Sequence, residues 1–353
     1  MPTHRNSESE RYRGPGKWLQ YALARGLLTV LCRIPVIGAY GLGRASGWLA
    51  WVIMKRRRAT VRGNLEIVNA WMEAKRAETG DRRLGGELRA EGGDRRLGGA
   101  QRAEGGDRKT EGSADQNARL PYSRPRSSPG AQVREVFQRS GANLLGGFTF
   151  TRMPSARAAR HIRIEGLESL KAALAEGRGA IILLAHMGPW EALAQLPGLA
   201  RTHDIAAPFG AMYRPLNNRY LDHWYRSRRE ARGTRLFSRN DGFHKPVAFL
   251  RGGGILGILA DQRLNRGEVV PFFGRPAKTS PIPGLLQRRS GAPVLAVAMQ
   301  TEGRAVWRIA IRPVEWSGAV ARERQAECAA VNRVLEVSLA QSVEDGFWFH
   351  RRF

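Results

Sequence analysis

Short apolar runs alternate with amphipathic segments along residues 131–353, and this alternation restricts the chain to few architectures. The apolar runs predict strands at 161–165, 179–185, 204–208, 254–260, 293–299 and 306–312. The amphipathic segments predict helices near 131–148, 167–176, 189–200, 215–232, 242–251, 282–290 and 321–345. Apolar strands that alternate with helices are typical of a largely parallel sheet flanked by helices, so we expect an α/β domain over residues 131–353.

Residues 18–54 form a different segment, which is apolar but interrupted by Arg25, Arg33 and Arg44. Its charge-free runs are shorter than the roughly 20 residues of a clean membrane-spanning helix. It contains tryptophans, which are common at membrane interfaces, and the basic cluster Lys55–Arg58 follows it. These features predict an N-terminal helical membrane anchor over residues 17–74, which either crosses the bilayer or lies on it. A buried pair of core helices is the alternative.

Residues 75–130 contain a 13-residue repeat that begins at Arg76, Arg89 and Arg102 and then runs into a Pro- and Ser-rich stretch. The copies are too poor in apolar side chains to bury a face, which argues against a solenoid. We therefore predict that residues 75–130 are a disordered insertion without a catalytic role. The polar residues 1–16 are likewise predicted to be a disordered N-terminus.

The chain carries 58 Lys and Arg residues against 31 Asp and Glu residues, a net charge of +27. Such an excess indicates a polyanionic partner, which could be an anionic membrane surface, an acidic ligand or nucleic acid. No helix-turn-helix, zinc-finger or RNP signature appears, so nucleic-acid binding is the weaker alternative and is not expected. The two cysteines are too few for a disulfide framework or a structural zinc site.

The segment IILLAHMGPWEAL carries the clearest candidate site. His186 follows an apolar strand, and ligands bind at this end of the strands in α/β sheets. Pro189 is suited to begin a helix, and Glu191 lies in its first turn, from which the carboxylate could fold back onto the imidazole. A carboxylate on one ring nitrogen leaves the other nitrogen free as a base. A structural histidine at a strand end is the alternative.

The surrounding sequence narrows the chemistry that this base could serve. There is no G-x-S-x-G nucleophile elbow and no P-loop, and the other histidines lack metal-ligand spacing. We therefore expect direct activation of a substrate hydroxyl, without a metal or a cofactor.

Several motifs in order resemble one known family. The run H-M-G-P-W-E from His186 to Glu191 resembles the H-x4-D/E block of glycerolipid and lipid A acyltransferases. GGGILGILADQR at 252–263 and VVPFFGRPAKT at 269–279 resemble later blocks of the lipid A biosynthesis lauroyl/myristoyl acyltransferase family, as do GAPVLAVAM, the C-terminal WFHRRF and the early RRRATVRGNLEIV. The resemblance covers the chain except for residues 1–16 and 75–130. Pro189 departs from the pattern, because the lipid A branch commonly has Asn there.

This resemblance implies a membrane-associated O-acyltransferase at the cytoplasmic face of a bacterial inner membrane. Its acyl donor would be acyl carrier protein, and its acceptor a hydroxyl of a lipid A precursor or a related glycolipid. A lysophospholipid or another simple lipid is the alternative acceptor. A basic nucleic-acid-binding protein and a non-catalytic membrane protein are the alternatives from other classes.

The resemblance also implies roles for individual residues. His186 would take the proton of the acceptor hydroxyl, Glu191 would orient and charge-stabilise His186, and Asp261 would support the same site. Arg229 best fits the arginine that would stabilise the oxyanion, although Arg226, Arg228 and Arg232 are close by. Two loops are candidates for contact with donor or acceptor, and a simple turn or buried packing is the alternative for each; their residues are Tyr213, Arg214 and Asn217 in the first and Phe272, Phe273 and Gly274 in the second.

Overall fold

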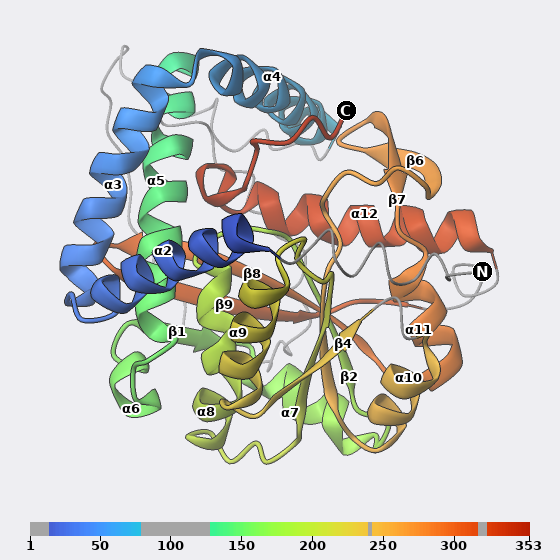
Figure 1. Ribbon diagram of the computed structural model, residues 1–353. Coiled ribbons are helices and arrows are strands. Elements are labelled where there is room, and N and C mark those ends of the chain that lie inside the picture. The colour runs from blue at the N-terminus through green and yellow to red at the C-terminus, as the bar shows by residue number, and fades with distance from the viewer. Residues whose placement is uncertain (1–13, 79–127, 239–241, 317–322) are drawn as a thin grey trace, which may run out of the picture.

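A seven-stranded sheet forms the centre of the protein, seen here in a computed structural model that describes residues 14–78, 128–238, 242–316 and 323–353 (Figure 1). The strand order is β1-β9-β8-β2-β5-β3-β4. The strands β8, β2, β5, β3 and β4 run parallel to one another, whereas β9 is antiparallel to β8 and β1 is parallel to β9. The sequence-based expectation of an α/β fold with a largely parallel sheet is therefore confirmed. The strands are β1 (Ile162–Glu165), β2 (Ala180–Leu184), β3 (Phe209–Tyr213), β4 (Thr234–Ser238), β5 (Ile255–Leu259), β8 (Val294–Gly303) and β9 (Val306–Pro313).

Helices surround this sheet, and a separate antiparallel hairpin of β6 (Glu268–Phe272) and β7 (Arg275–Thr279) lies beside it. The helices before the sheet are α2 (Pro15–Leu31), α3 (Val36–Ile53), α4 (Lys55–Glu78), α5 (Pro129–Phe150) and α6 (Ser155–Ala158). Those between strands are α7 (Leu167–Ala175), the 3₁₀ helix η2 (Trp190–Gln195), α8 (Leu196–Arg201), α9 (Arg219–Glu230), α10 (His244–Arg251) and α11 (Ile282–Ser290). The chain then forms α12 (Arg324–Ala340) and the 3₁₀ turn η5 (Val343–Asp345).

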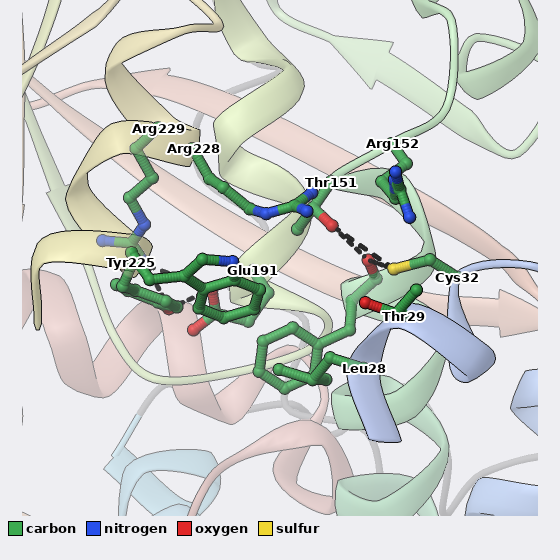
Figure 2. Close-up of a pocket in the computed structure, with 11 residues that line it drawn as sticks. Leu28, Thr29, Cys32, Thr151, Arg152, Glu191, Tyr225, Arg228 and Arg229 are labelled. Atoms are coloured by element: carbon green, nitrogen blue, oxygen red, sulfur yellow. Dashed lines mark hydrogen bonds and ion pairs between the residues drawn. The ribbon is translucent and has the colours of Figure 1, made fainter. Parts of the chain in front are cut away.

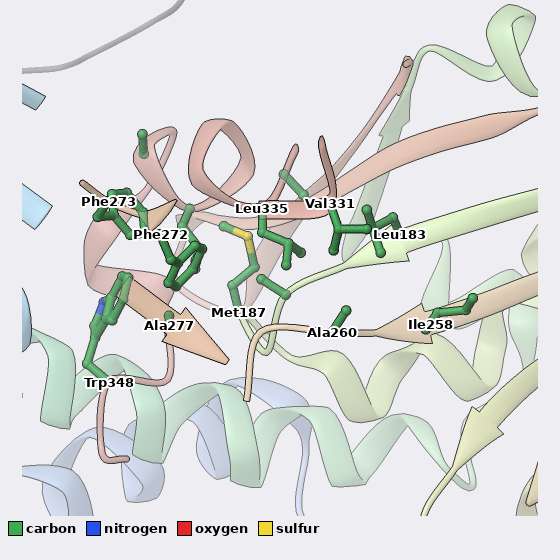
Figure 3. Close-up of a cluster of buried hydrophobic side chains, with 14 of the residues drawn as sticks. Leu183, Met187, Ile258, Ala260, Phe272, Phe273, Ala277, Val331, Leu335 and Trp348 are labelled. Atoms are coloured by element: carbon green, nitrogen blue, oxygen red, sulfur yellow. The ribbon is translucent and has the colours of Figure 1, made fainter. Parts of the chain in front are cut away.

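Two hydrophobic cores cover the two faces of the sheet. Successive side chains of a strand point to opposite faces, so Ile181 and Leu183 of β2 enter one core while Ile182 and Leu184 enter the other. The first core packs against α12 and α4 (Figure 3), and the second packs against α7 and α8. Because the central strands are buried on both faces, their sequences read as continuous apolar runs.

The helices α3 and α5 lie side by side at unusually close range (Figure 1). Glycines allow this approach: a Cβ on Gly47 would meet the Phe137 carbonyl oxygen at 2.2 Å, and one on Gly43 would meet the Gly141 carbonyl oxygen at 2.4 Å. Arg44 of α3 binds Glu135 of α5 through two hydrogen bonds of 3.0 and 2.9 Å. One of the charges that interrupt the apolar N-terminal segment is therefore neutralised within the fold.

The N-terminal helices pack as part of the α/β domain. The apolar face of α4 carries Val61, Leu65, Val68 and Met72, all of which lie in the same core as α12. None of the helices within the described ranges is both long enough and apolar enough to cross a bilayer.

The expected boundaries need correction in three places. Helix α2 begins at Pro15, inside the expected disordered N-terminus, and α4 continues to Glu78, beyond residue 74. Helix α5 begins at Pro129, before the expected boundary at 131. The remaining parts of the two segments that we expected to be disordered, 1–13 and 79–127, lie outside the described residues.

Candidate active site

His186 and Asp261 meet at the carboxyl edge of the sheet because they follow neighbouring parallel strands. Leu184 of β2 is in register with Leu259 of β5, and His186 and Asp261 lie two residues beyond these strand ends. The Nδ1 atom of His186 lies 2.6 Å from Oδ1 of Asp261, and both side chains are largely buried. A carboxylate can only accept at this distance, so Nδ1 carries the hydrogen and the Nε2 lone pair is left as the base.

The two charges stabilise each other despite their burial. Burial lowers the pKa of His186, but the charge and hydrogen bond of Asp261, together with the charge of Glu191, raise it above its usual value. Burial raises the pKa of Asp261, but the charge and hydrogen bonds from His186 hold it below its usual range. The arrangement therefore favours an ionised Asp261 beside an imidazole that accepts a proton readily.

The turn after His186 is held by a segment from the far end of the sequence. The backbone N–H of Phe347 donates to the His186 carbonyl at 2.8 Å, and that of Gly188 donates to the Asp345 carbonyl at 3.0 Å. Gly188 has φ +59, and a Cβ there would meet the Met299 carbonyl oxygen at 2.6 Å. The turn therefore requires glycine and cannot shift without breaking its contacts to residues 345–347.

Asp345 is itself fixed by a buried polar network. Its carboxylate accepts hydrogen bonds from Asn143 at 2.9 Å, Arg139 at 3.1 Å and the Thr301 backbone N–H at 2.8 Å. These partners come from α5 and β8, so the network ties the turn after His186 to two elements of the scaffold. Charged groups buried in this way are costly to leave unpaired, which makes the position of Asp345 well defined.

Glu191 does not bond His186, contrary to the orienting role that we expected for it. Its Oε2 accepts from the Tyr225 hydroxyl and from Nη2 of Arg229 at 3.1 Å (Figure 2). Both partners lie on α9, one turn apart, and face Glu191 across the gap to η2. Because η2 starts after Pro189, its first turn directs the carboxylate toward α9 instead of back to the strand end. Glu191 reaches His186 only through its charge.

A cavity of about 600 Å³ opens in front of His186. Many of the expected site residues line it, and they come from the end of β2, from η2, from the end of β3 and the loop after it, and from α9; they are His186, Glu191, Tyr213, Arg214, Asn217 and Arg229. Asp261 stands behind His186 and does not line this cavity. Strand ends from distant parts of the sequence thus form one pocket, as is usual in open α/β sheets.

The loop of Phe272, Phe273 and Gly274 does not line the large cavity, and the structure agrees with the packing alternative for its two phenylalanines. It is the turn of the β6–β7 hairpin, and both phenylalanines are almost fully buried in the core beside Trp348 (Figure 3). Phe273 adopts φ +50, and its N–H donates to Glu336 of α12 at 2.5 Å. These contacts place the loop in the hydrophobic core.

A smaller apolar cavity of about 80 Å³ adjoins the large one on one face of the sheet. The two share Trp190, Met212, Leu259 and Arg229 as lining residues. Beyond that boundary the smaller cavity is lined by aliphatic and aromatic residues of β2, β3 and β5 and by Leu193 and Leu196. Such a lining suits a hydrocarbon chain.

Comparison with known proteins identifies the family. A family model for bacterial lipid A biosynthesis acyltransferases matches residues 117–353. The chain belongs to this family. The lipid A biosynthesis palmitoleoyltransferase of Escherichia coli (strain K12) and the lipid A biosynthesis acyltransferase of Shigella flexneri are each 29% identical to it over 204 residues, which is 57% of this chain and 64% of each relative. The match therefore spans less than two thirds of these relatives' length.

A more distant relative carries a different name. The phosphatidylinositol mannoside acyltransferase of Mycobacterium tuberculosis (strain CDC 1551 / Oshkosh) is 30% identical over 157 residues. This match covers 42% of the present chain and 47% of that relative.

Three residues of this lipid A acyltransferase family member complete the site although sequence reasoning did not select them. Trp190 packs edge-on against the His186 ring at 5.7 Å between centroids, and Tyr225 binds Glu191. Gln262 places its amide nitrogen 3.2 Å from Nε2 of His186. Trp190 and Gln262 each had a signal in the sequence, because Trp190 lies in the H-M-G-P-W-E run and Gln262 directly follows Asp261. Among the described residues, no group of three or more His, Cys, Asp or Glu side chains is placed to hold a metal ion.

Proposed function

We propose that the protein is a membrane-associated O-acyltransferase, which transfers a fatty acyl group from acyl carrier protein to a hydroxyl of a lipid A precursor or a related glycolipid. The observation that carries the proposal is the His186–Asp261 pair, which faces a large cavity in a chain of the lipid A acyltransferase family. The names of the relatives support acyl transfer to a glycolipid acceptor.

In the proposed reaction, Nε2 of His186 takes the proton of the acceptor hydroxyl as its oxygen attacks the thioester carbonyl carbon. Asp261 accepts the hydrogen bond from the Nδ1–H of His186 and stabilises the imidazolium that forms. The tetrahedral intermediate collapses, the carbon–sulfur bond breaks, and the thiolate takes the proton from His186. The base therefore returns to its neutral form, and no acyl-enzyme intermediate is required.

Glu191 and Arg229 have a positioning role in this proposal. Their ion pair connects η2 with α9 and fixes one wall of the large cavity. Burial and the charge of Glu191 raise the pKa of Tyr225 well above its ordinary value, so its hydroxyl stays protonated and donates to Glu191. The wall is thereby kept in one arrangement next to the reacting groups.

The lining of the two cavities suggests where the substrates bind. The smaller, apolar cavity suits a short part of the acyl chain, with the thioester in the larger cavity near His186. Arg214 and Arg263 are exposed cations on the wall of the larger cavity, and the chain as a whole carries +27. These charges suit an acidic carrier protein and an anionic lipid acceptor.

Helices α2 and α3 would hold the protein on the cytoplasmic face of a bacterial inner membrane. Their outer side exposes large apolar residues, among them Trp18, Leu23, Leu27, Trp48 and Ile53. Exposed apolar side chains flanked by Arg25 and by the cluster at 55–58 are typical of helices that lie on an anionic lipid surface.

A transfer assay tests the proposal. The full chain would be incubated with one acyl donor and one acceptor at a time. The donors are lauroyl-, myristoyl- and palmitoleoyl-acyl carrier protein, and the acceptors are a lipid A precursor, a phosphatidylinositol mannoside and a lysophospholipid. Mass spectrometry should detect an acylated product that requires His186, so His186→Gln should abolish it. His223→Gln, an exposed histidine on α9, should retain activity as the matched control. Absence of product with every donor and acceptor, or full activity of His186→Gln, would contradict the proposal.

A further inference from the structure

The turn after His186 offers no backbone N–H to a developing oxyanion. The N–H of Met187 donates to the Ala185 carbonyl at 2.9 Å, and the N–H of Gly188 is bound to Asp345. Pro189 has no N–H, and the N–H of Trp190 donates to the Gly188 carbonyl at 3.0 Å. This turn therefore does not supply the oxyanion donor, and the polar side chains around His186 are the candidates considered next.

Arg229, the donor suggested by sequence, is bound elsewhere. Its Nη2 atom donates to Glu191 at 3.1 Å and to the Tyr225 hydroxyl at 2.5 Å, and its guanidinium stacks over the Tyr225 ring at 4.1 Å. Aligning it on a reacting carbonyl would require these contacts to break and would leave a buried carboxylate unpaired.

Gln262 is already in contact with the reacting nitrogen. Its amide nitrogen lies 3.2 Å from Nε2 of His186, and its side chain lines the large cavity. Because Nδ1 donates its hydrogen to Asp261, Nε2 can only accept, so the amide presents its N–H and not its oxygen. Gln262 directly follows Asp261, just beyond the end of β5, so the strand fixes the position of its backbone relative to His186.

We propose that the side-chain amide of Gln262 is the oxyanion donor of the acyl transfer, an inference that rests on the proposed function. When the acceptor hydroxyl takes its place on Nε2, the amide moves aside by one rotamer and its N–H meets the thioester oxygen. As the hydroxyl oxygen bonds to the carbonyl carbon, its proton passes to Nε2 of His186, and the electron pair of the C=O double bond moves onto the carbonyl oxygen. When the carbon–sulfur bond breaks, this pair re-forms the C=O double bond of the ester, and the proton moves from His186 to the departing thiolate.

Two variants test this role in the full chain with palmitoleoyl-acyl carrier protein and the acceptor that the wild type acylates. Gln262→Met keeps the length of the side chain without a donor, and Gln262→Ala removes the side chain. In each, kcat should fall by about 10²- to 10³-fold, as when an oxyanion donor is lost, while KM for the acceptor changes little. Asn265→Ala, an exposed amide on the same loop, should retain the wild-type kcat.

A second readout does not depend on turnover. The Gln262 N–H stabilises the neutral imidazole, so both variants should raise the pKa of His186 in an NMR titration of the free protein. Asp261 and Glu191, whose charges act on His186, are unchanged in both variants. If the wild type transfers acyl groups and Gln262→Met keeps the wild-type kcat, whether or not its KM rises, then Gln262 is not the oxyanion donor. The proposed function stands in that case. If the wild type transfers none, both proposals fail.

Discussion

His186 is influenced by two carboxylates at different ranges. Asp261 is hydrogen-bonded to its ring, whereas Glu191 is bonded to Arg229 and adds only its charge. This difference separates the residue that sets the tautomer from the residue that holds the cavity wall.

Asp261→Asn should therefore lower kcat far more than Glu191→Gln does. An amide in place of the carboxylate no longer fixes the tautomer, and the loss in a comparable His–carboxylate pair is about 10⁴-fold. The His186 pKa, raised by Asp261, should fall, so the acid limb of the pH profile of kcat/KM should move to lower pH. A pH-rate series would show this.

The same series decides the role of Glu191. Glu191→Gln should shift the acid limb in the same direction but by less, because the direct hydrogen bond to Asp261 remains. If Glu191→Gln costs as much kcat as Asp261→Asn, then Glu191 acts directly on the reaction.

The buried carboxyl group of Glu336 should make the free energy of unfolding depend on pH. Burial raises its pKa to about 7 from the ordinary 4.5, although the Phe273 N–H bonded to it opposes the shift. The folded state thus binds the proton more tightly than the unfolded state, and this stabilisation is present in full below about pH 4.5 and is lost as the pH rises through 7. A shift of this size corresponds to about 3 kcal/mol.

Glu336→Gln should remove this dependence, because the amide stays neutral and its oxygen can still accept from Phe273. Urea unfolding at about pH 5 and about pH 8 should show a smaller loss of unfolding free energy in the variant than in the wild type. Glu66→Gln, an exposed position on α4, is the control and should behave like the wild type. An unchanged pH dependence in Glu336→Gln would show that other groups cause it.

The pattern of strands and turns placed His186, and the family resemblance added Asp261. Both residues follow a predicted apolar strand, and the structure brings these two strand ends together. The partner of Glu191 could not be predicted, because the direction of its side chain depends on a 3₁₀ turn and on the position of α9 in space. The surroundings of Phe272 and Phe273 could not be predicted either, since aromatic residues in a loop occur both in binding sites and in hydrophobic cores.

At the scale of elements, the contact between α3 and α5 depends on the absence of side chains. Gly47→Ala places a methyl group 2.2 Å from the Phe137 carbonyl oxygen, so the helices must move apart. We expect a loss of about 1–3 kcal/mol in the free energy of unfolding. Chemical denaturation measures it.

Gly63→Ala on α4 is the matched control. No neighbouring atom lies within 4 Å of the added Cβ, so alanine should stabilise this helix by up to about 1 kcal/mol through its higher helix propensity. Equal stability of Gly47→Ala and the wild type would mean that the two helices adjust without cost.

The strands that the sequence predicted correctly each contain a run or an alternation of apolar residues. Strands β2 and β5 are largely buried apolar runs, β8 begins with one, and β1 and β9 alternate apolar with charged residues; all five were expected close to their observed positions. The prediction of a strand at 204–208 was wrong: β3 begins at Phe209, directly after Pro208, which has no N–H to give to a neighbouring strand. Strand β4 and the β6–β7 hairpin were missed because charged residues and proline interrupt their apolar pattern.

At the scale of the whole molecule, apolar exposure is concentrated on one side. Most of the exposed large hydrophobic side chains belong to α2 and α3, which lie together away from the β6–β7 hairpin in Figure 1. A water-exposed apolar surface of this kind is unfavourable unless another surface covers it.

Replacing Leu23 and Leu27 with Gln should weaken the binding of the full chain to vesicles of phosphatidylglycerol and phosphatidylethanolamine. Each leucine that inserts into lipid contributes at least about 1.5 kcal/mol, so the double variant should bind about 100-fold more weakly in a sedimentation assay. Val269→Gln on β6 removes an exposed apolar residue elsewhere and should bind like the wild type. If the double variant sediments like the wild type, α2 does not contact the lipid.

The contacts between residues 345–347 and the turn at His186 have a consequence for how the protein is made. A ribosome that has passed Asp261 has already produced both members of the pair, yet the segment that fixes the turn has still to be synthesised. Helices α2 and α3 emerge long before it. A chain that stopped before residue 345 would therefore contain both His186 and Asp261 but would lack the backbone contacts that hold the turn between His186 and Gly188.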